Sequence, residues 1–379
     1  PGVTGPPIMP SFSALRWPAI LAVWTLATAV VAAEPDWPQW RGPAGDGHAR
    51  ATTDLPVTWS ESENVAWKTP IPGRGWSSPV IGQGQVWVTT AVEQEATPSE
   101  RERRLATRSG NQPTDVAAKV TFRAICLDQA SGRVVHDVEL FSVADPQPIH
   151  ALNSYASPSP VLTPGRLFCH FGDFGAACID TATGDVLWMN RDLRLDHVNG
   201  PGSSPVIWHN LLIVHLDGSD MQSIAAYDVD SGRVVWQTPR SGRLREDPDL
   251  KKAYATPLVV TSGGRDVLVS PAADWVYGYD PATGLELWRL SYGVLGYSVV
   301  PRPVAAAGLV FLSTSFNQPE LLAIRLTGKD GHPEIAWREK KAAPSMSSPL
   351  IVGDDLYMVS DKGVASCLEA GSGRPVWVQ

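Results

Sequence analysis

The amino-acid sequence predicts an all-β protein, a β-propeller of four-stranded antiparallel blades. One turn segment recurs along the chain, with an acid, a Ser or Thr, a Gly and a Trp at fixed spacing, and a Pro-containing segment precedes each copy. The composition of 33 Gly, 33 Pro and 15 Trp in 379 residues suits many short strands separated by turns. Each repeat has room for about four short strands, which is the content of one propeller blade.

The recurring turn is interpreted as a hairpin between two antiparallel strands. Its acid can accept hydrogen bonds from backbone N–H groups, and its Gly supplies the positive φ of a bulged turn. The Trp buries a large flat surface against the next blade. We therefore assign a structural docking role to Asp180, Gly184, Trp188, Asp228, Gly232, Trp236, Asp280, Gly284, Trp288, Gly373 and Trp377.

The Pro-containing segments mark the start of each blade. Their prolines are Pro79, Pro160, Pro205, Pro257, Pro303 and Pro349, and after Pro160 they recur every 45 to 52 residues. The stretch "NVAWKTP" around Trp67 is interpreted as the closing strand of a blade whose other strands come from the far end of the chain. Because the sequence stops just after Trp377, we expect a truncated C-terminus, and seven or eight blades in the intact protein.

The N-terminus has the form of an export signal. Residues 1–8 precede Met9 and are interpreted as upstream sequence; Arg16 then precedes an apolar run from Ile20 to Val31. Small residues allow cleavage after Ala33, so we assign residues 1–33 to upstream sequence plus signal peptide and 34–379 to a single propeller domain. An uncleaved anchor is the alternative. The mature protein is expected in the periplasm or outside the cell, without a transmembrane segment.

Charge and spacing give two further expectations. The net charge of −8 argues against nucleic acid as a partner, because phosphate binding needs a basic excess. The first spacing, from Pro79 to Pro160, is longer than the others, and residues 91–119 are polar without a strand period. We predict a surface insertion loop there, with docking of a partner as the alternative.

The repeated acid, Gly and Trp resemble the docking motif of the pyrroloquinoline-quinone (PQQ)-like repeat family, in the quinoprotein alcohol dehydrogenase-like superfamily. The opening "DWPQWRGPAGDG" is similar to the start of exported bacterial members. The resemblance implies a β-propeller, but the same propeller serves quinone-dependent dehydrogenases and a non-catalytic scaffold of outer-membrane assembly. The dehydrogenases carry a vicinal Cys pair and some a CxxCH haem site, and this sequence contains neither.

A binding site is expected where the repeat is broken, since structural needs are shared by all blades. Polar residues precede two successive blades and lie near a third, and we predict that they converge on an axial funnel that binds a ligand: Asn153, Tyr155, His197, Asn199 and Arg302. The alternative is that these side chains only satisfy turns. No catalytic residue is assigned.

Two smaller hypotheses concern metal and sulfur. Asp173, Asp196, Asp217 and Asp220 could ligate calcium, but their spacing fits no compact metal loop, so no metal site is assigned. In a hairpin centred on "DF", Cys169 would lie directly opposite Cys178, and an exported protein could oxidise the pair to a disulfide.

The preferred interpretation is an exported, non-catalytic propeller that binds a protein or a small ligand, with possible association with the cell envelope. The alternatives are a PQQ-dependent alcohol dehydrogenase, with calcium and PQQ as cofactors, and a scaffold for assembling outer-membrane proteins. No cofactor is predicted from the residues themselves.

Overall fold

The computed structural model describes residues 1–3, 5, 37–49, 55–106, 112–314, 316–328 and 332–379. The chain divides into two compact units, Pro1–Ala32 and Ala33–Gln379, and the strands found in the described residues belong to the second. The predicted signal-peptide run lies outside the described residues.

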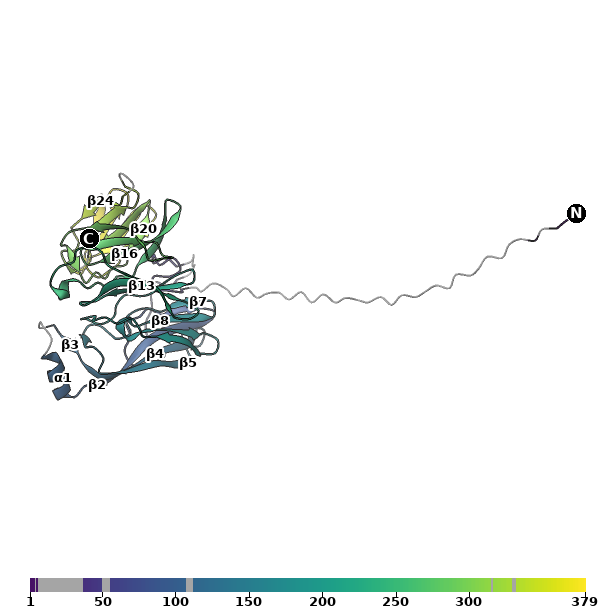
Figure 1. The fold of residues 1–379 in the computed structure, drawn as a ribbon, viewed down its shortest axis with the longest axis horizontal. Helices are drawn as coiled ribbons and strands as arrows, with labels where there is room; N and C mark the ends of the chain where they lie inside the picture. The colour runs from purple at the N-terminus through teal and green to yellow at the C-terminus, as the bar shows by residue number, and fades with distance from the viewer. Residues whose placement is uncertain (4, 6–36, 50–54, 107–111, 315, 329–331) are drawn as a thin grey trace. The chain divides into compact units, whose positions relative to one another are not determined.

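Six four-stranded antiparallel sheets follow one another along the second unit (Figure 1). Sheet 1 comprises β1 (Val80–Gly82), β2 (Gln85–Glu95), β4 (Ala117–Asp128) and β5 (Val134–Ala144). Sheet 2 comprises β7 (Val161–Thr163), β8 (Arg166–His170), β9 (Ala176–Asp180) and β10 (Val186–Asn190). Sheet 3 comprises β11 (Val206–Trp208), β12 (Leu211–Asp217), β13 (Gln222–Asp228) and β14 (Val234–Pro239).

The second half of the chain repeats this pattern. Sheet 4 comprises β15 (Leu258–Ser262), β16 (Arg265–Ala272), β17 (Trp275–Tyr279) and β18 (Glu286–Ser291). Sheet 5 comprises β20 (Val304–Ala306), β21 (Leu309–Ser313), β23 (Leu321–Arg325) and β24 (Glu334–Glu339). Sheet 6 comprises β25 (Leu350–Val352), β26 (Asp355–Val359), β27 (Ala365–Glu369) and β28 (Pro375–Val378). The predicted all-β class and the four-stranded antiparallel blade are confirmed.

Antiparallel order gives the sheets two different ends. The turns between first and second strands and between third and fourth strands lie at one end, here called the turn face. The connections between sheets, and those between second and third strands, lie at the other end, here called the loop face. Two short ribbons belong to the loop connections: β3 (Thr114–Asp115) with β6 (Ile149–His150), and β19 (Gly296–Tyr297) with β22 (Phe316–Asn317).

The hydrophobic core lies between consecutive sheets. In β12, Leu212 and Val214 share a cluster with Phe168 of sheet 2, whereas Ile213 shares the next cluster with Leu268 of sheet 4. Successive side chains of a strand point to opposite faces, so one central strand serves two cores. This explains why β12 is buried along its whole length, while the outer strand β14 is never fully buried.

The predicted docking turns join each sheet to the next. Gly232 has φ +68°, and a Cβ added to it would lie 2.5 Å from the Trp188 ring of the preceding sheet. Gly284 receives Trp236 in the same way, and Gly373 receives Trp337. The structure therefore confirms why this slot needs Gly: the ring takes the volume of a side chain, and the backbone is left-handed.

Two kinds of hydrogen bond at the joints were not anticipated from the sequence. The Trp188 indole N–H donates to the carbonyl of Val229 at 2.9 Å, one residue after the acid. The side chain two residues after the Trp, Asn190, donates to the carbonyl of Gly232 at 2.9 Å. Trp67 and Thr69 make the same pair of contacts with the turn of sheet 1, at 3.0 and 2.6 Å.

The segment around Trp67 thus docks as a closing strand would. Its indole packs on Gly132 and on the outer face of sheet 1, although no strand is assigned between residues 61 and 79 of the described chain. The predicted strand is therefore reproduced in its contacts but not in its secondary structure.

The predicted insertion loop 91–119 is more ordered than the sequence suggested. β2 continues to Glu95, β4 begins at Ala117, and α1 (Pro98–Leu105) lies between them, with Thr97 and Glu100 forming a reciprocal N-terminal cap. The long strands of sheet 1 were missed because their exposed ends carry polar residues without apolar alternation.

The Pro-containing segments have a structural purpose beyond starting each blade. In several of these segments, the residue before the Pro donates its backbone N–H to the hydroxyl of the corresponding residue in the next sheet. These bonds run from Ser78 to Ser159 (2.8 Å), from Ser159 to Ser204 (2.9 Å) and from Ser204 to Thr256 (3.0 Å). The first strands are thereby gathered around a common axis, which fits the propeller fold.

Candidate functional site

Residues 37–48, here called the axial strap, lie along the first strands that surround this axis. Trp37 exchanges two backbone hydrogen bonds with Ile81 of β1, at 2.9 and 2.8 Å, and the carbonyl of Pro38 accepts from Leu162 of β7 at 2.7 Å. At its other end, the His48 ring contacts the carbonyl of Ile351 in β25 at 2.6 Å. One short segment therefore contacts first strands of sheets 1, 2 and 6.

Arg302 anchors the strap to sheet 5. It occupies the slot before the Pro in which every other repeat has Ser or Thr, and it is 3% exposed. Its Nη1 donates to the carbonyl of Trp40 at 2.7 Å, and its guanidinium lies against Gly45. The predicted ligand-binding role of Arg302 stays a prediction; what the structure places beside its side chain is the chain's own strap.

The other four predicted funnel residues come together between sheets 1, 2 and 3. Asn153 donates to the carbonyls of Asn199 and Pro201, at 2.8 and 3.1 Å. Tyr155 is fully buried and donates to the carbonyl of Gln147 at 2.9 Å. In this arrangement the side chains join two loop connections, and Arg302 contacts a different set of residues.

His197 belongs to a buried polar network at the loop ends of the strands. Its Nε2 accepts a hydrogen bond from the backbone N–H of Asp173 at 2.9 Å, so the ring is neutral and carries its proton on Nδ1. Burial, and then the neighbouring His170, lower the pKa of His197 to about 3. His170 is 2% exposed, neither ring nitrogen has a hydrogen-bond partner among the described residues, and burial lowers its pKa to about 4.

A buried ion pair continues this network. Arg240 donates from Nε and Nη2 to the two oxygens of Asp217 at 3.0 and 2.7 Å, and both side chains are fully buried. Burial acts to lower the pKa of Arg240, but the Asp217 carboxylate outweighs burial and raises it. The pair is therefore charged, and the Tyr277 and Tyr279 rings lie 5.0 and 5.7 Å from the guanidinium carbon.

Ser270, His215 and Asp217 resemble a nucleophile, base and acid in composition but not in geometry. Ser270 Oγ lies 2.8 Å from His215 Nε2, yet it also accepts from Arg240 Nη1 at 2.6 Å, and the His215–Asp217 separation is 4.0 Å. The cavity beside them is about 10 Å³, which is room for one water molecule. The three side chains are thus part of the buried polar network around the Arg240–Asp217 pair.

The four aspartates of the calcium hypothesis are engaged separately. Asp217 pairs with Arg240, and Asp173 accepts from Arg194 at 2.9 Å. Asp220 accepts from the backbone N–H of Asp196 at 2.7 Å. Within the described ranges, no group of three or more His, Cys, Asp or Glu side chains could hold a metal ion.

The predicted Cys169–Cys178 disulfide is wrong in this structure, where all four cysteines are free. A 3₁₀ turn at Gly172–Phe174 shifts the hairpin register by one residue, so Cys169 faces Ala177 and Cys178 faces Phe168. A shift of one residue puts a side chain on the opposite face of a sheet. The two thiols accordingly belong to different cores, between sheets 1 and 2 and between sheets 2 and 3.

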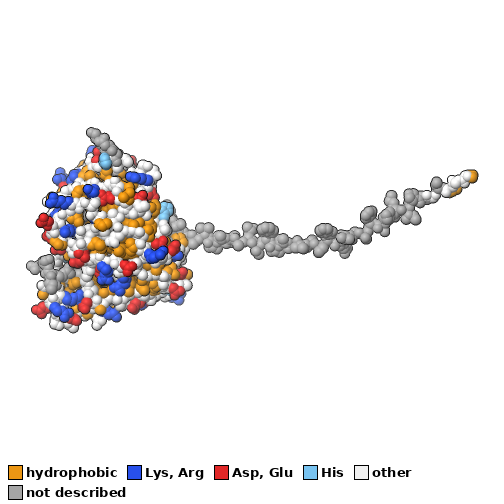
Figure 2. All heavy atoms as spheres, in the orientation of Figure 1, with side chains coloured by type: hydrophobic (Ala, Val, Ile, Leu, Met, Phe, Trp, Pro, Cys, Tyr) orange, Lys and Arg blue, Asp and Glu red, His pale blue; other side chains and the backbone are white. Residues whose placement is uncertain are grey.

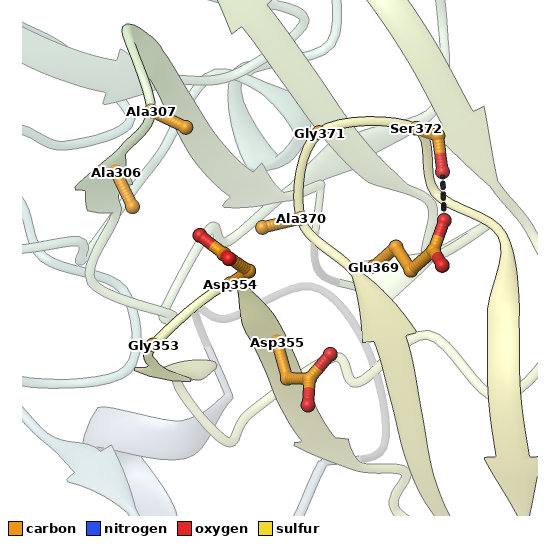
Figure 3. A pocket seen from close by; sticks show the side chains of 9 residues that line it. All are labelled: Ala306, Ala307, Gly353, Asp354, Asp355, Glu369, Ala370, Gly371 and Ser372. Carbon is orange, nitrogen blue, oxygen red and sulfur yellow. Dashed lines mark hydrogen bonds between the residues drawn. The ribbon is translucent and has the colours of Figure 1, made fainter.

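An open pocket of about 490 Å³ lies on the turn face between sheets 5 and 6 (Figure 3). Asp354, Asp355 and Glu369 give it an acidic lining, and Glu369 accepts from Ser372 at 2.9 Å and from Arg374 at 3.0 Å. None of the predicted funnel residues lines it.

Exposed apolar side chains occur on the loop face at positions that do not repeat. Trp76 is 58% exposed, and its indole donates to the carbonyl of Leu152, which is 82% exposed. Phe316 of the β19–β22 ribbon is 60% exposed. Acidic and basic side chains are mixed over the surface visible in Figure 2, so no large patch of one sign gathers on that side.

The axis of this chain does not fit a quinone cofactor of the kind the fold family suggests. First strands of sheets 1 and 2 are hydrogen-bonded to the strap, and the Arg302 side chain is covered by it. A planar ligand on the axis would have to displace residues 37–48.

The strap was missed from the sequence because "DWPQWRGPAGDG" served only as a family signature. Its signal was available: three glycines within six residues indicate positive φ, and the structure has Gly42, Gly45 and Gly47 at +78°, +68° and +96°. None of the helices within the described residues is long and apolar enough to span a membrane.

Comparison with known proteins gives two kinds of match. A family model described as outer membrane protein assembly factor BamB matches residues 110–271 and 272–379. Curated proteins of that name from Shewanella oneidensis and Yersinia pestis are 23% identical over 246 residues and 26% identical over 163 residues. The matches cover 59% and 41% of this chain, and the chain spans 57% and 38% of these relatives.

A solved structure, a quinohemoprotein alcohol dehydrogenase from Comamonas testosteroni, matches with a TM-score of 0.57 at 15% identity. The match covers 91% of this chain and 73% of that protein. A match at this identity shows the fold alone.

Proposed function

This chain belongs to the family of outer membrane protein assembly factor BamB, and from that premise we propose that it is a non-catalytic propeller scaffold serving the assembly of outer-membrane proteins. Together, the two matched segments cover part of sheet 1 and all of sheets 2 to 6. Both curated relatives carry the same name, which supports a scaffold rather than an enzyme.

The observation that carries the proposal is the way the interior is filled. The strap is hydrogen-bonded to the first strands. The cavity beside the buried His and Arg–Asp network has a volume of only about 10 Å³. An enzyme whose chemistry took place at this buried network would need concave space there for its substrate. A scaffold needs only a rigid body and an outer surface.

The partner is a protein, and the loop face is the surface proposed to meet it. Exposed Trp and Phe side chains suit protein recognition, because aromatic residues dominate interface energetics. Trp76 and Phe316 are held by the loop connections rather than by the repeat, so they can vary without disturbing the sheets. Export to the cell envelope, with residues 1–33 as the leader, is part of the same proposal.

The test combines a cellular and a biochemical measurement. In a strain lacking the gene, we expect the folded fraction of outer-membrane β-barrel proteins to fall, measured by heat-dependent gel mobility. A tagged copy should co-purify with outer-membrane assembly components, and Trp76→Ala should weaken this recovery without lowering the protein's melting temperature. Leu187→Ala, an exposed residue of the outer strand β10, is the matched control.

Two results would contradict the proposal. One is an unchanged folded fraction in the deletion strain together with no co-purification. The other is saturable PQQ binding with calcium, accompanied by dye reduction with alcohols, because it would demonstrate the dehydrogenase alternative.

A further inference from the structure

Two arginine side chains, Arg41 of the strap and Arg302 just before β20, lie close together. Arg302 is 3% exposed, and Arg41 is partly buried next to Gly47 and Leu350. Burial, and then the charge of the neighbouring Arg41, lower the pKa of Arg302 to about 10. Two cationic side chains therefore share one region of low dielectric.

Neither guanidinium is neutralised by a carboxylate at ion-pair distance among the described residues. Arg41 Nη2 donates to the backbone carbonyls of Asp46 and Pro349, both at 2.7 Å, and Arg302 Nη1 donates to the carbonyl of Trp40. The Asp46 carboxylate is nearby, but its Oδ1 accepts from the His48 backbone N–H at 3.0 Å.

Each guanidinium also has an N–H group without a partner. The Nε atoms of Arg41 and Arg302 are buried, and neither has a hydrogen-bond acceptor in the part of the chain that the structure describes. A buried donor left unpaired is destabilising, and an uncompensated buried charge is more so. Net positive charge and orphan donors at one place are the features of an anion-binding site.

The local backbone is shaped around these side chains. A Cβ on Gly45 would lie 2.4 Å from Arg302 Nη2, and one on Gly47 would lie 2.8 Å from Arg41 Nη2. Both glycines have positive φ. The neighbouring Ala44 is exposed, whereas Gly45, which lies against the Arg302 guanidinium, is buried.

We propose that Arg41 and Arg302 form a binding site for one small oxyanion, such as phosphate, sulfate or a small carboxylate, beneath the strap. The oxyanion accepts hydrogen bonds from both guanidiniums and supplies the missing counter-charge. This site is independent of the scaffold function, and it accounts for Arg in the one repeat that departs from the Ser or Thr slot.

The experiment uses the purified full chain at pH 7.5 and constant ionic strength, with phosphate, sulfate, acetate or chloride as the added ion. We expect phosphate or sulfate at 50 mM to raise the melting temperature by about 3 °C over chloride, with saturation, as for a ligand at millimolar affinity. Equilibrium dialysis of radiolabelled phosphate should give one ion per chain.

The informative variant is Arg302→Ser, which restores the hydroxyl found in the other repeats and removes one charge. Compared with its own melting temperature in anion-free buffer, this variant should show no stabilisation by phosphate. Arg265→Gln, at an exposed position in β16, should keep the full response.

Outcomes on the unmodified chain decide the proposal even if a variant fails to fold. A saturable oxyanion effect with one bound ion supports it, and weaker binding by Arg41→Gln supports it further. Three results would overturn it: equal stabilisation by chloride and phosphate, no phosphate bound to the protein in equilibrium dialysis, or an undiminished response to phosphate in Arg302→Ser. The deletion-strain measurement is unaffected by any of these results.

Discussion

Lowering the pH should destabilise this protein through two buried histidines, and the size of the effect can be worked out. His170 and His197 are neutral in the folded state, with pKa values lowered to about 4 and about 3 from an ordinary 6.5. A histidine whose pKa is lower in the folded than in the unfolded protein binds more protons when the chain unfolds. Its contribution to stability is therefore complete above pH 6.5 and is lost as the pH falls toward its pKa in the folded protein.

At pH 5, the unfolded chain has almost fully protonated both rings, whereas the folded chain has protonated neither to a large extent. Each pKa unit is worth 1.36 kcal/mol, so each ring should lower the free energy of unfolding by about 2 kcal/mol between pH 7.5 and pH 5. Two other buried groups also respond to pH: His215, whose pKa is lowered well below its ordinary value by burial, and Asp217, whose pKa is raised by burial.

Comparing the parent chain with a variant that lacks one histidine cancels the contributions of the groups that both proteins share. His170→Gln lacks one titrating ring, so its loss of stability between pH 7.5 and pH 5 should be about 2 kcal/mol smaller than that of the parent chain. His332→Gln, at an exposed position, should behave as the parent does. Urea unfolding followed by tryptophan fluorescence at several pH values measures the difference. Identical pH dependence for the parent and His170→Gln would refute the reasoning.

Three other predictions concern packing and the thiols. Gly232→Ala should destabilise the chain by about 2 to 4 kcal/mol in urea unfolding, because the new side chain meets both a positive φ and the docked Trp ring. The control Gly165→Ala has a φ of +79° but open space around it, and should cost only about 1 kcal/mol. Equal losses in the two variants would exclude an effect of the ring contact. Asp217→Asn should cost about 3 to 5 kcal/mol, since it leaves Arg240 buried and uncompensated; a loss below about 1 kcal/mol would mean that the pair is not charged. Thiol titration in denaturant without reductant should count four free cysteines, and a count of two would restore the disulfide.

The fold could be predicted from the sequence because its determinants are local and repeated. An acid, a left-handed Gly and a Trp each act within one turn or one joint, and several copies reinforce the same interpretation. The disulfide failed for a related reason: pairing in a hairpin depends on the conformation of its loop, and the 3₁₀ turn at Gly172–Phe174 changes the register by one residue.

The contacts of the candidate site could not be predicted, because they join residues far apart in the chain. Arg302 meets Trp40 and Gly45 across more than 250 residues, and no spacing rule connects them. The departure of Arg302 from the repeat was visible, and it correctly singled out an unusual position. Its surroundings depend on how the strap folds along the first strands, which single-sequence patterns do not contain.

The joints between sheets have an implication for how such a chain can change over time. Most sheets carry a Trp that docks on the following sheet and a Gly turn that receives the preceding one, so the couplings all run in the same direction. Duplication of a stretch from one Pro-containing segment to the next would add a sheet with both couplings already complete. His136, which stands in the Trp position of sheet 1 and packs on Gly184, and Arg302 are exceptions. The sheets that carry them are the ones that could not be exchanged for a copy of a neighbour.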